Sequence, residues 1–165
     1  MLDRPCPECG LDTRRIARTD VAAMLRRNAA AWPALLDGAA RTRPHPDRWS
    51  PLEYACHVRD VHRVYTARLH LMTTEDDPRY PNWDQDATAE GERYGEQDPA
   101  TVAGELTAAA EVLASAFEQV SDWTRTGTRS DGACFTIDTF ARYLVHDPVH
   151  HLWDVTGTQA EQSAR

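Results

Sequence analysis

The sequence predicts an all-α protein, an antiparallel four-helix bundle with a short N-terminal Cys-Pro-x-Cys-Gly extension. Three observations lead to this fold class. Four segments carry apolar residues at helical spacing, each begins near a residue that can cap a helix, and polar connections with proline or glycine separate them. We therefore divide the chain into the extension at 1–18, the bundle at 19–157 and a frayed tail at 158–165.

The first two helices have recognisable start and stop residues. Thr19 is expected to cap the first helix, and Pro33 should end it late because proline lacks the amide hydrogen that a helix interior needs. Ser50, followed by a proline and then Glu53, forms a complete capping box for the second helix. Its apolar stripe predicts that it runs to about Thr74.

The third and fourth helices are bounded in the same way. Asp98 precedes a proline and should cap the third helix, and Thr136 should cap the fourth. Gly157 is expected to stop the fourth helix, because glycine readily adopts the left-handed conformation that ends many helices. Pro148 falls inside this helix and should bend it.

Two long connections separate these helices. Residues 75–98 read as a polar loop with a short helical turn, and residues 121–135 read as a Gly- and Thr-rich connection. Loops as long as the first are usually functional or disordered. Its aromatic residues favour packing over disorder: Tyr80, Trp83 and Tyr94.

Composition limits the possible partners. The net charge is −8, which argues against nucleic acid or an anionic membrane as a partner, because both require a basic face. No apolar run approaches the length of a membrane span, and the first residues lack the apolar region of a signal peptide. We therefore expect a cytoplasmic protein whose cysteines are thiols, metal ligands or redox centres.

Three of the seven histidines fall within six residues near the end of the chain. His146 and His150 are four residues apart, so a helix places both imidazoles on one face. His57 lies on the inward stripe of the second helix and could join them. Three imidazoles with a fourth position open are the ligand set of a catalytic zinc ion. The alternative is that His57 is a satisfied core histidine and the late cluster a polar helix end.

The neighbouring polar residues receive supporting roles. His151 points about 100° away from His150 on the helix, so we expect it outside the ligand set or on the surface. Asp147 and Asp154 are expected to accept ring hydrogens from ligand histidines or to face solvent. The remaining histidines are expected on the surface: His45, His62 and His70.

Cys6 and Cys9 lie in a Cys-Pro-Glu-Cys-Gly loop, which can hold a second metal ion between two thiolates. Such a site needs further ligands, from Cys56, Cys134 or a loop histidine. The alternatives are an exposed dithiol, a disulfide, or an element that contacts another protein or a second copy. Cys56 is expected to be a small buried packing residue.

The segment Trp-Ser-Pro-Leu-Glu-Tyr-Ala-Cys-His at 49–57, together with His146-x3-His150, resembles the DinB-like superfamily. That superfamily includes the mycothiol-dependent maleylpyruvate isomerase type and the bacillithiol transferases. The resemblance covers about residues 20–157 and implies a four-helix bundle. By position, it also implies that His57, His146 and His150 hold a divalent ion.

The resemblance further implies a metal-dependent transferase or isomerase that uses a low-molecular-weight thiol and an electrophilic substrate. All basic residues are arginine, which is typical of a GC-rich, actinobacterial type of genome, where the thiol would be mycothiol. Zinc is the expected metal, with nickel, iron or manganese as alternatives. Catalytic residues stay unassigned, although Arg129 could hold a substrate carboxylate or pair with a nearby aspartate. The competing hypothesis is a non-catalytic, stress-related module whose metal stabilises the bundle; a homodimer is also left open.

Overall fold

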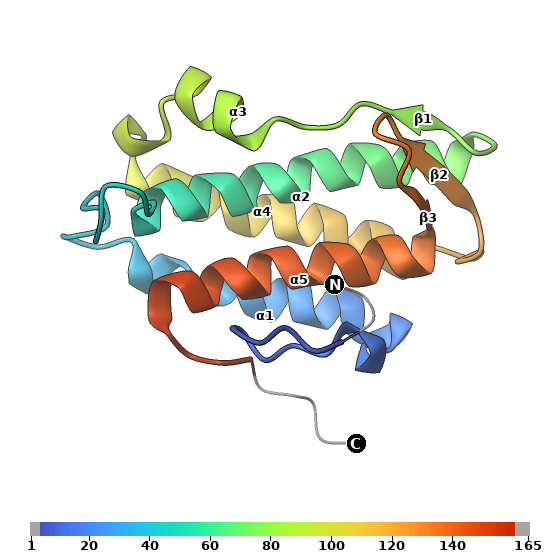
Figure 1. Ribbon diagram of the computed structural model, residues 1–165, viewed down its shortest axis with the longest axis horizontal. Helices are drawn as coiled ribbons and strands as arrows, with labels where there is room; N and C mark the ends of the chain where they lie inside the picture. Colours follow the sequence, from blue (N-terminus) through green and yellow to red (C-terminus); the bar gives the residue numbers. More distant parts are fainter. Residues whose placement is uncertain (1–3, 161–165) are drawn as a thin grey trace.

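The computed structural model describes residues 4–160, and over this range it confirms the four-helix bundle (Figure 1). The bundle helices are α1 (Val21–Ala31), α2 (Pro51–Thr74), α4 (Pro99–Glu118) and α5 (Ile137–Thr156). Their apolar faces meet in two buried groups, one around Phe140 and Leu144 and the other around Trp32 and Leu52.

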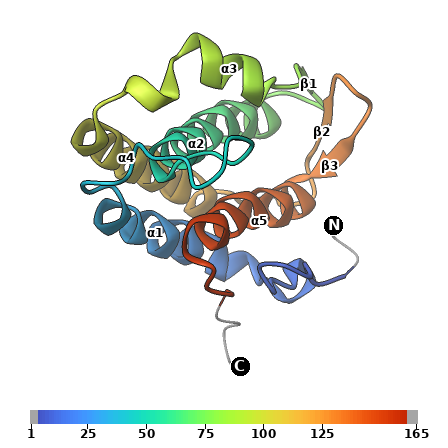
Figure 2. The ribbon, with the colours of Figure 1, turned by 60° about the vertical axis from the view of Figure 1, so that its left-hand side comes forward.

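The bundle contains both parallel and antiparallel neighbours, so the antiparallel arrangement that the sequence predicts holds for only some of the helix pairs. The main contacts join α2 with α4, α1 with α4, α2 with α5 and α1 with α5. Figures 1 and 2 show that α2 and α4 run in one direction while α1 and α5 run in the other. Helices α2 and α4 can run in the same direction because the connection between them is long enough to lead back to the end of the bundle where α2 begins.

The local start signals are confirmed at three of the four helices. Ser50 and Glu53 form the capping box of α2, while Asp98 and Thr136 each accept a hydrogen bond from the first turn of α4 and α5. The Thr19 prediction was wrong, because a 3₁₀ turn at Arg18–Asp20 leads into α1 and, within the described chain, no side chain caps it.

The ends of two bundle helices also follow the predictions. Helix α1 stops at Ala31, and a 3₁₀ turn at Pro33–Leu35 follows, as the proline predicts. Gly157 ends α5 with a φ of 69°, a conformation that costs glycine little.

The connection after α2 contains β1 (Arg79–Tyr80), α3 (Gln85–Gly91) and a 3₁₀ turn at Tyr94–Glu96. Figure 2 shows α3 lying on the outer side of α2. Tyr80 and Tyr94 are buried and Trp83 packs against the core, so the expected aromatic packing is confirmed.

Residues 121–135, expected as a Gly- and Thr-rich connection, contain strands that the all-α prediction did not include. Strands β2 (Thr126–Arg129) and β3 (Cys134–Thr136) form an antiparallel hairpin there, and β1 joins β2 in parallel. These strands are short and lack an apolar alternation, which is the pattern by which a half-buried strand is recognised. They close the end of the bundle where α2 finishes and α5 begins (Figure 1).

The N-terminal segment packs on the bundle instead of projecting from it. Cys9, Leu11 and Ile16 are buried in the same apolar group as Phe140 of α5, and a 3₁₀ turn spans Thr13–Arg15. At the other end of the chain, the Ala160 amide donates a hydrogen bond to the Cys9 carbonyl at 2.9 Å. The first three residues of the predicted tail are therefore held, while residues 161–165 lie outside the described part.

Among the described helices, α4 is long and apolar enough to cross a membrane by length and composition alone. Core helices of soluble proteins pass the same test. In this structure α4 packs against both α1 and α2, and its Val102, Leu106 and Leu113 side chains are buried.

Candidate metal centre

The first cluster of potential ligands, which we call the interhelical cluster, consists of His57 on α2 and of Asp147 and His151 on α5. One ligand atom from each lies within 4.8 Å of the others. Nε2 of His57 is 3.3 Å from Oδ1 of Asp147, and Nε2 of His151 is 3.7 Å from the same oxygen. Because Asp147 and His151 are four residues apart, α5 presents them on one face towards His57.

The polar atoms of the interhelical cluster lack conventional partners. Within residues 4–160, both ring nitrogens of His57 and Oδ1 of Asp147 are buried without a regular hydrogen bond, although Nε2 of His57 approaches Oδ1 of Asp147 to 3.3 Å. Desolvation raises the pKa of Asp147, but His57 and His151 outweigh it and hold that pKa below its ordinary value. A divalent cation between these groups would satisfy the lone pairs that the fold leaves unpaired.

Surrounding side chains orient the interhelical cluster. The Trp83 ring stacks on the His57 imidazole, with 5.3 Å between the ring centroids and an interplanar angle of 6°. Trp49 packs on the same imidazole. Nδ1 of His151 lies 2.9 Å from Oδ2 of Asp154. If Nδ1 carries the proton of that hydrogen bond, Nε2 keeps its lone pair and faces Asp147. Asp154 therefore contacts a histidine ring, as one of the two expectations for it stated, and that ring belongs to His151.

The second cluster, which we call the knuckle cluster, consists of Cys6, Cys9, His146 and His150. One ligand atom from each lies within 4.8 Å of the others, and Sγ of Cys6 is 3.6 Å from Nδ1 of His150. Cys9 and His146 are buried, so Cys9 is not an exposed thiol. Burial and the adjacent Cys6 thiol raise the pKa of Cys9 to about 11.

The structure thus divides the predicted ligand set. Within the described chain, His57 belongs to the interhelical cluster, while His146 and His150 face the N-terminal loop. His151, expected to be a bystander, belongs with His57 instead. The sequence contained the missed signal, because Asp147 and His151 have the same four-residue spacing as His146 and His150.

The structure also places the remaining histidines and cysteines of the chain. His45 and His70 are exposed and Cys56 is buried, as expected. The surface prediction for His62 was wrong, because its side chain is fully buried on α2 and burial lowers its pKa to about 4. Cys134 is exposed and belongs to neither cluster formed by the described residues.

A cavity of 490 Å³ connects the two clusters. Besides ligands of both clusters, its lining includes Arg4 and Gln85, neither of which the sequence pointed to. Of the two roles that the sequence left open for Arg129, the structure shows the pairing with a nearby aspartate, since its guanidinium lies 2.8 Å from the Asp131 carboxylate. Arg4, rather than Arg129, therefore lines the cavity beside the potential ligands.

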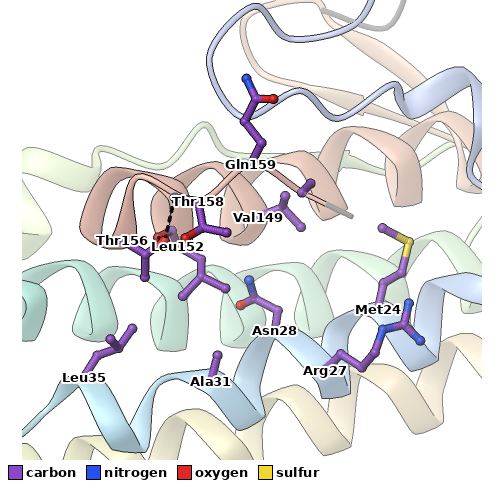
Figure 3. Close-up of a pocket in the computed structure, with 11 residues that line it drawn as sticks. Met24, Arg27, Asn28, Ala31, Leu35, Val149, Leu152, Thr156, Thr158 and Gln159 are labelled. Carbon is purple, nitrogen blue, oxygen red and sulfur yellow. Dashed lines mark hydrogen bonds between the residues drawn. The ribbon is translucent and has the colours of Figure 1, made fainter. Parts of the chain in front are cut away.

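A separate cavity of 410 Å³ lies between α1 and α5. Figure 3 shows Met24, Arg27 and Asn28 of α1 facing Val149 and Leu152 of α5 across it. Its lining contains no histidine, cysteine or carboxylate among the described residues, so it offers no metal ligands.

Comparison with known proteins agrees with this architecture. The family model of the DinB superfamily matches residues 6–155, a span that includes the Cys6–Cys9 loop left outside the sequence resemblance. No curated protein sequence matches the chain.

Two solved structures share the fold. One is YfiT from Bacillus subtilis, which is described as a probable metal-dependent hydrolase with an unusual four-helix bundle topology. It matches with a TM-score of 0.76 and 18% sequence identity, and the match covers 85% of this chain and 84% of YfiT. A mycothiol-dependent maleylpyruvate isomerase has a TM-score of 0.62 and 13% identity over 87% of this chain. The present chain spans only 62% of the isomerase. At these identities the two likenesses show the fold alone.

Proposed function

Because the chain belongs to the DinB superfamily, we propose that it is a metal-dependent enzyme whose ion is held by His57, Asp147 and His151. The observation that carries this proposal is the set of buried ring and carboxylate atoms that converge between α2 and α5 without hydrogen-bond partners in the described chain. Converging lone pairs of this kind are costly to bury unless a cation shares them.

The chemistry of the ligands supports a catalytic role. Two imidazoles and one carboxylate leave a tetrahedral site one protein ligand short, as in catalytic zinc sites. When bound, a divalent ion there lowers the pKa of a water or thiol in its open position. The same ligand types suit zinc, and also iron, nickel or manganese.

Residues around the cluster would orient the ligands and the substrate. Asp154 holds the His151 ring through Nδ1, and Trp83 covers one face of His57 and keeps water from it. Arg4 and Gln85 line the 490 Å³ cavity, which lies within the usual range for a small-molecule site. Arg4 can hold a carboxylate or another anionic group of a substrate by two hydrogen bonds.

The reaction class that we propose is transfer or isomerisation with a low-molecular-weight thiol of the mycothiol type as cosubstrate. The fold shared with a mycothiol-dependent isomerase supports it, as does a cavity that reaches the open side of Asp147 and His151. Metal-assisted hydrolysis, in which water replaces the thiol, is the second candidate, favoured by the likeness to YfiT. A reducing, cytoplasmic location would keep such a thiol available.

Metal content of single variants tests the ligand assignment. His57→Ala and His151→Ala should each lose the ion of the interhelical cluster, whereas His70→Ala, an exposed histidine on the same helix as His57, should keep it. Elemental analysis after dialysis measures the stoichiometry. Full metal retention in both ligand variants would overturn the assignment.

Turnover tests the reaction class. The purified protein is incubated with mycothiol and a dinitrophenyl halide, and thiol consumption is followed before and after chelation. Consumption above background that chelation abolishes and added metal restores supports the transferase. Hydrolysis of activated esters or amides without thiol would favour the hydrolase. A chelator that lowers the melting temperature while no turnover is found would favour the non-catalytic module.

A further inference from the structure

The knuckle cluster, four side chains from opposite ends of the chain, has the composition of a closed zinc site. Two cysteines and two histidines form one of the common structural sets for tetrahedral zinc. Standard bond lengths place a thiolate sulfur and an imidazole nitrogen on one such ion about 3.6 Å apart. Sγ of Cys6 and Nδ1 of His150 are 3.6 Å apart.

The loop that carries the two cysteines already has the turn that such a site requires. The Cys6 amide donates to the Leu11 carbonyl at 3.0 Å, and the Gly10 amide donates to the Cys6 carbonyl at 3.1 Å. Gly10 has a φ of +76°, which a residue with a side chain rarely adopts. These hydrogen bonds hold Cys6 and Cys9 on the same side of the loop, facing α5.

The histidines are also arranged as ligands. His146 is 6% exposed, and its Nε2 atom is buried without a hydrogen-bond partner among the described residues. His150 directs Nδ1 towards Cys6 and Nε2 towards the Glu8 carboxylate at 3.5 Å. A carboxylate behind a ligand histidine is the usual outer partner in zinc sites, because it fixes which nitrogen faces the metal.

We propose that Cys6, Cys9, His146 and His150 bind one zinc ion in a closed, structural site. Four protein ligands complete the tetrahedron, so this ion has no open position for substrate, unlike the ion proposed for the interhelical cluster. The paired thiolates favour zinc over magnesium, calcium or manganese. Each thiol releases its proton when the ion binds.

The site joins segments that are distant in the sequence. It ties the N-terminal loop to α5, and this loop also holds the chain after α5: Gln159 donates to the Glu8 carbonyl at 3.2 Å and Ala160 to the Cys9 carbonyl. It further secures the wall of the 490 Å³ cavity that contains Arg4. Because His146 and His150 directly precede Asp147 and His151, the bound ion would also hold α5 in the rotation that helix packing establishes and that presents those residues to His57.

The test uses zinc and cobalt(II) with the reduced full-length protein. Zinc stoichiometry should fall by one equivalent in a Cys6→Ser/Cys9→Ser double variant and stay unchanged in Cys134→Ser, the exposed cysteine control. Cobalt(II) in the wild-type protein should produce a thiolate-to-cobalt charge-transfer band and the intense visible bands of tetrahedral coordination. The charge-transfer band should vanish in the double variant and persist in His57→Ala.

The cobalt spectrum of the wild-type protein keeps the test decisive even if the double variant fails to fold. A reduced wild-type protein that binds cobalt without a charge-transfer band overturns the proposal, and so does a band that survives in a folded double variant. The outcome is separate from that of the proposed function. Turnover without the band refutes the closed site alone, and the band without turnover refutes the enzyme alone.

Discussion

Replacing Asn28 by alanine should destabilise the bundle by about 2–3 kcal/mol. Asn28 is a buried residue of α1 whose amide nitrogen donates to the Pro148 carbonyl at 2.8 Å and whose oxygen accepts from Nε1 of Trp32 at 3.1 Å. Two buried hydrogen bonds contribute about 1 kcal/mol each, and two stranded partners add to this cost. The adjacent 410 Å³ cavity lets water reach part of the vacated space, which keeps the loss near the lower end (Figure 3).

Urea denaturation at saturating zinc measures the change in the free energy of unfolding, with Asn82→Ala as the matched control. Asn82 is an exposed asparagine, so its truncation should change stability by less than about 0.5 kcal/mol. A loss below about 1 kcal/mol for Asn28→Ala would refute the assigned hydrogen bonds. Because Pro148 lies between the two members of each proposed ligand pair of α5, His146 with His150 and Asp147 with His151, the variant should also bind metal more weakly than the control.

Two further predictions concern stability. Gly127→Ala should lower the free energy of unfolding by about 1–3 kcal/mol, because the new methyl group would lie 2.7 Å from Cγ of Met72. Gly104→Ala, in an open position of α4, should instead stabilise the protein by up to about 1 kcal/mol. Equal effects of the two substitutions in thermal melts would contradict this. His62 has a folded pKa of about 4, below its unfolded value, so its contribution to stability is complete above about pH 6.5 and is lost as the pH falls towards 4. Over this range the wild-type protein should lose about 3 kcal/mol more than His62→Met. The substitution leaves the proposed metal ligands in place, so any loss of metal should affect both proteins alike, and parallel pH profiles would refute the neutral, buried imidazole.

Local sequence accounts for most of the helix boundaries. The Ser50–Glu53 capping box, the Asp98 cap and the Gly157 stop each depend on hydrogen bonds or backbone angles within one turn of the residue itself. Such interactions are short in range, so they can be predicted without knowledge of the fold. The hairpin at Thr126–Thr136 could not be predicted in this way, because its strand β2 also pairs with β1, which lies far away in the sequence.

The sequence by itself determined that this chain forms a metal-ligand-rich helix in a four-helix bundle, because helical spacing alone places His146 with His150 on one face. Only the tertiary structure decided how the potential ligands are divided between the two clusters. Asp147 and His151 lie on a second face, about 100° around the same helix, and that face meets His57 while the first meets the Cys6–Cys9 loop. Helical periodicity defines both faces equally. Which neighbour each face meets depends on the rotation of α5, and this rotation is set by packing against α1, α2 and the N-terminal segment.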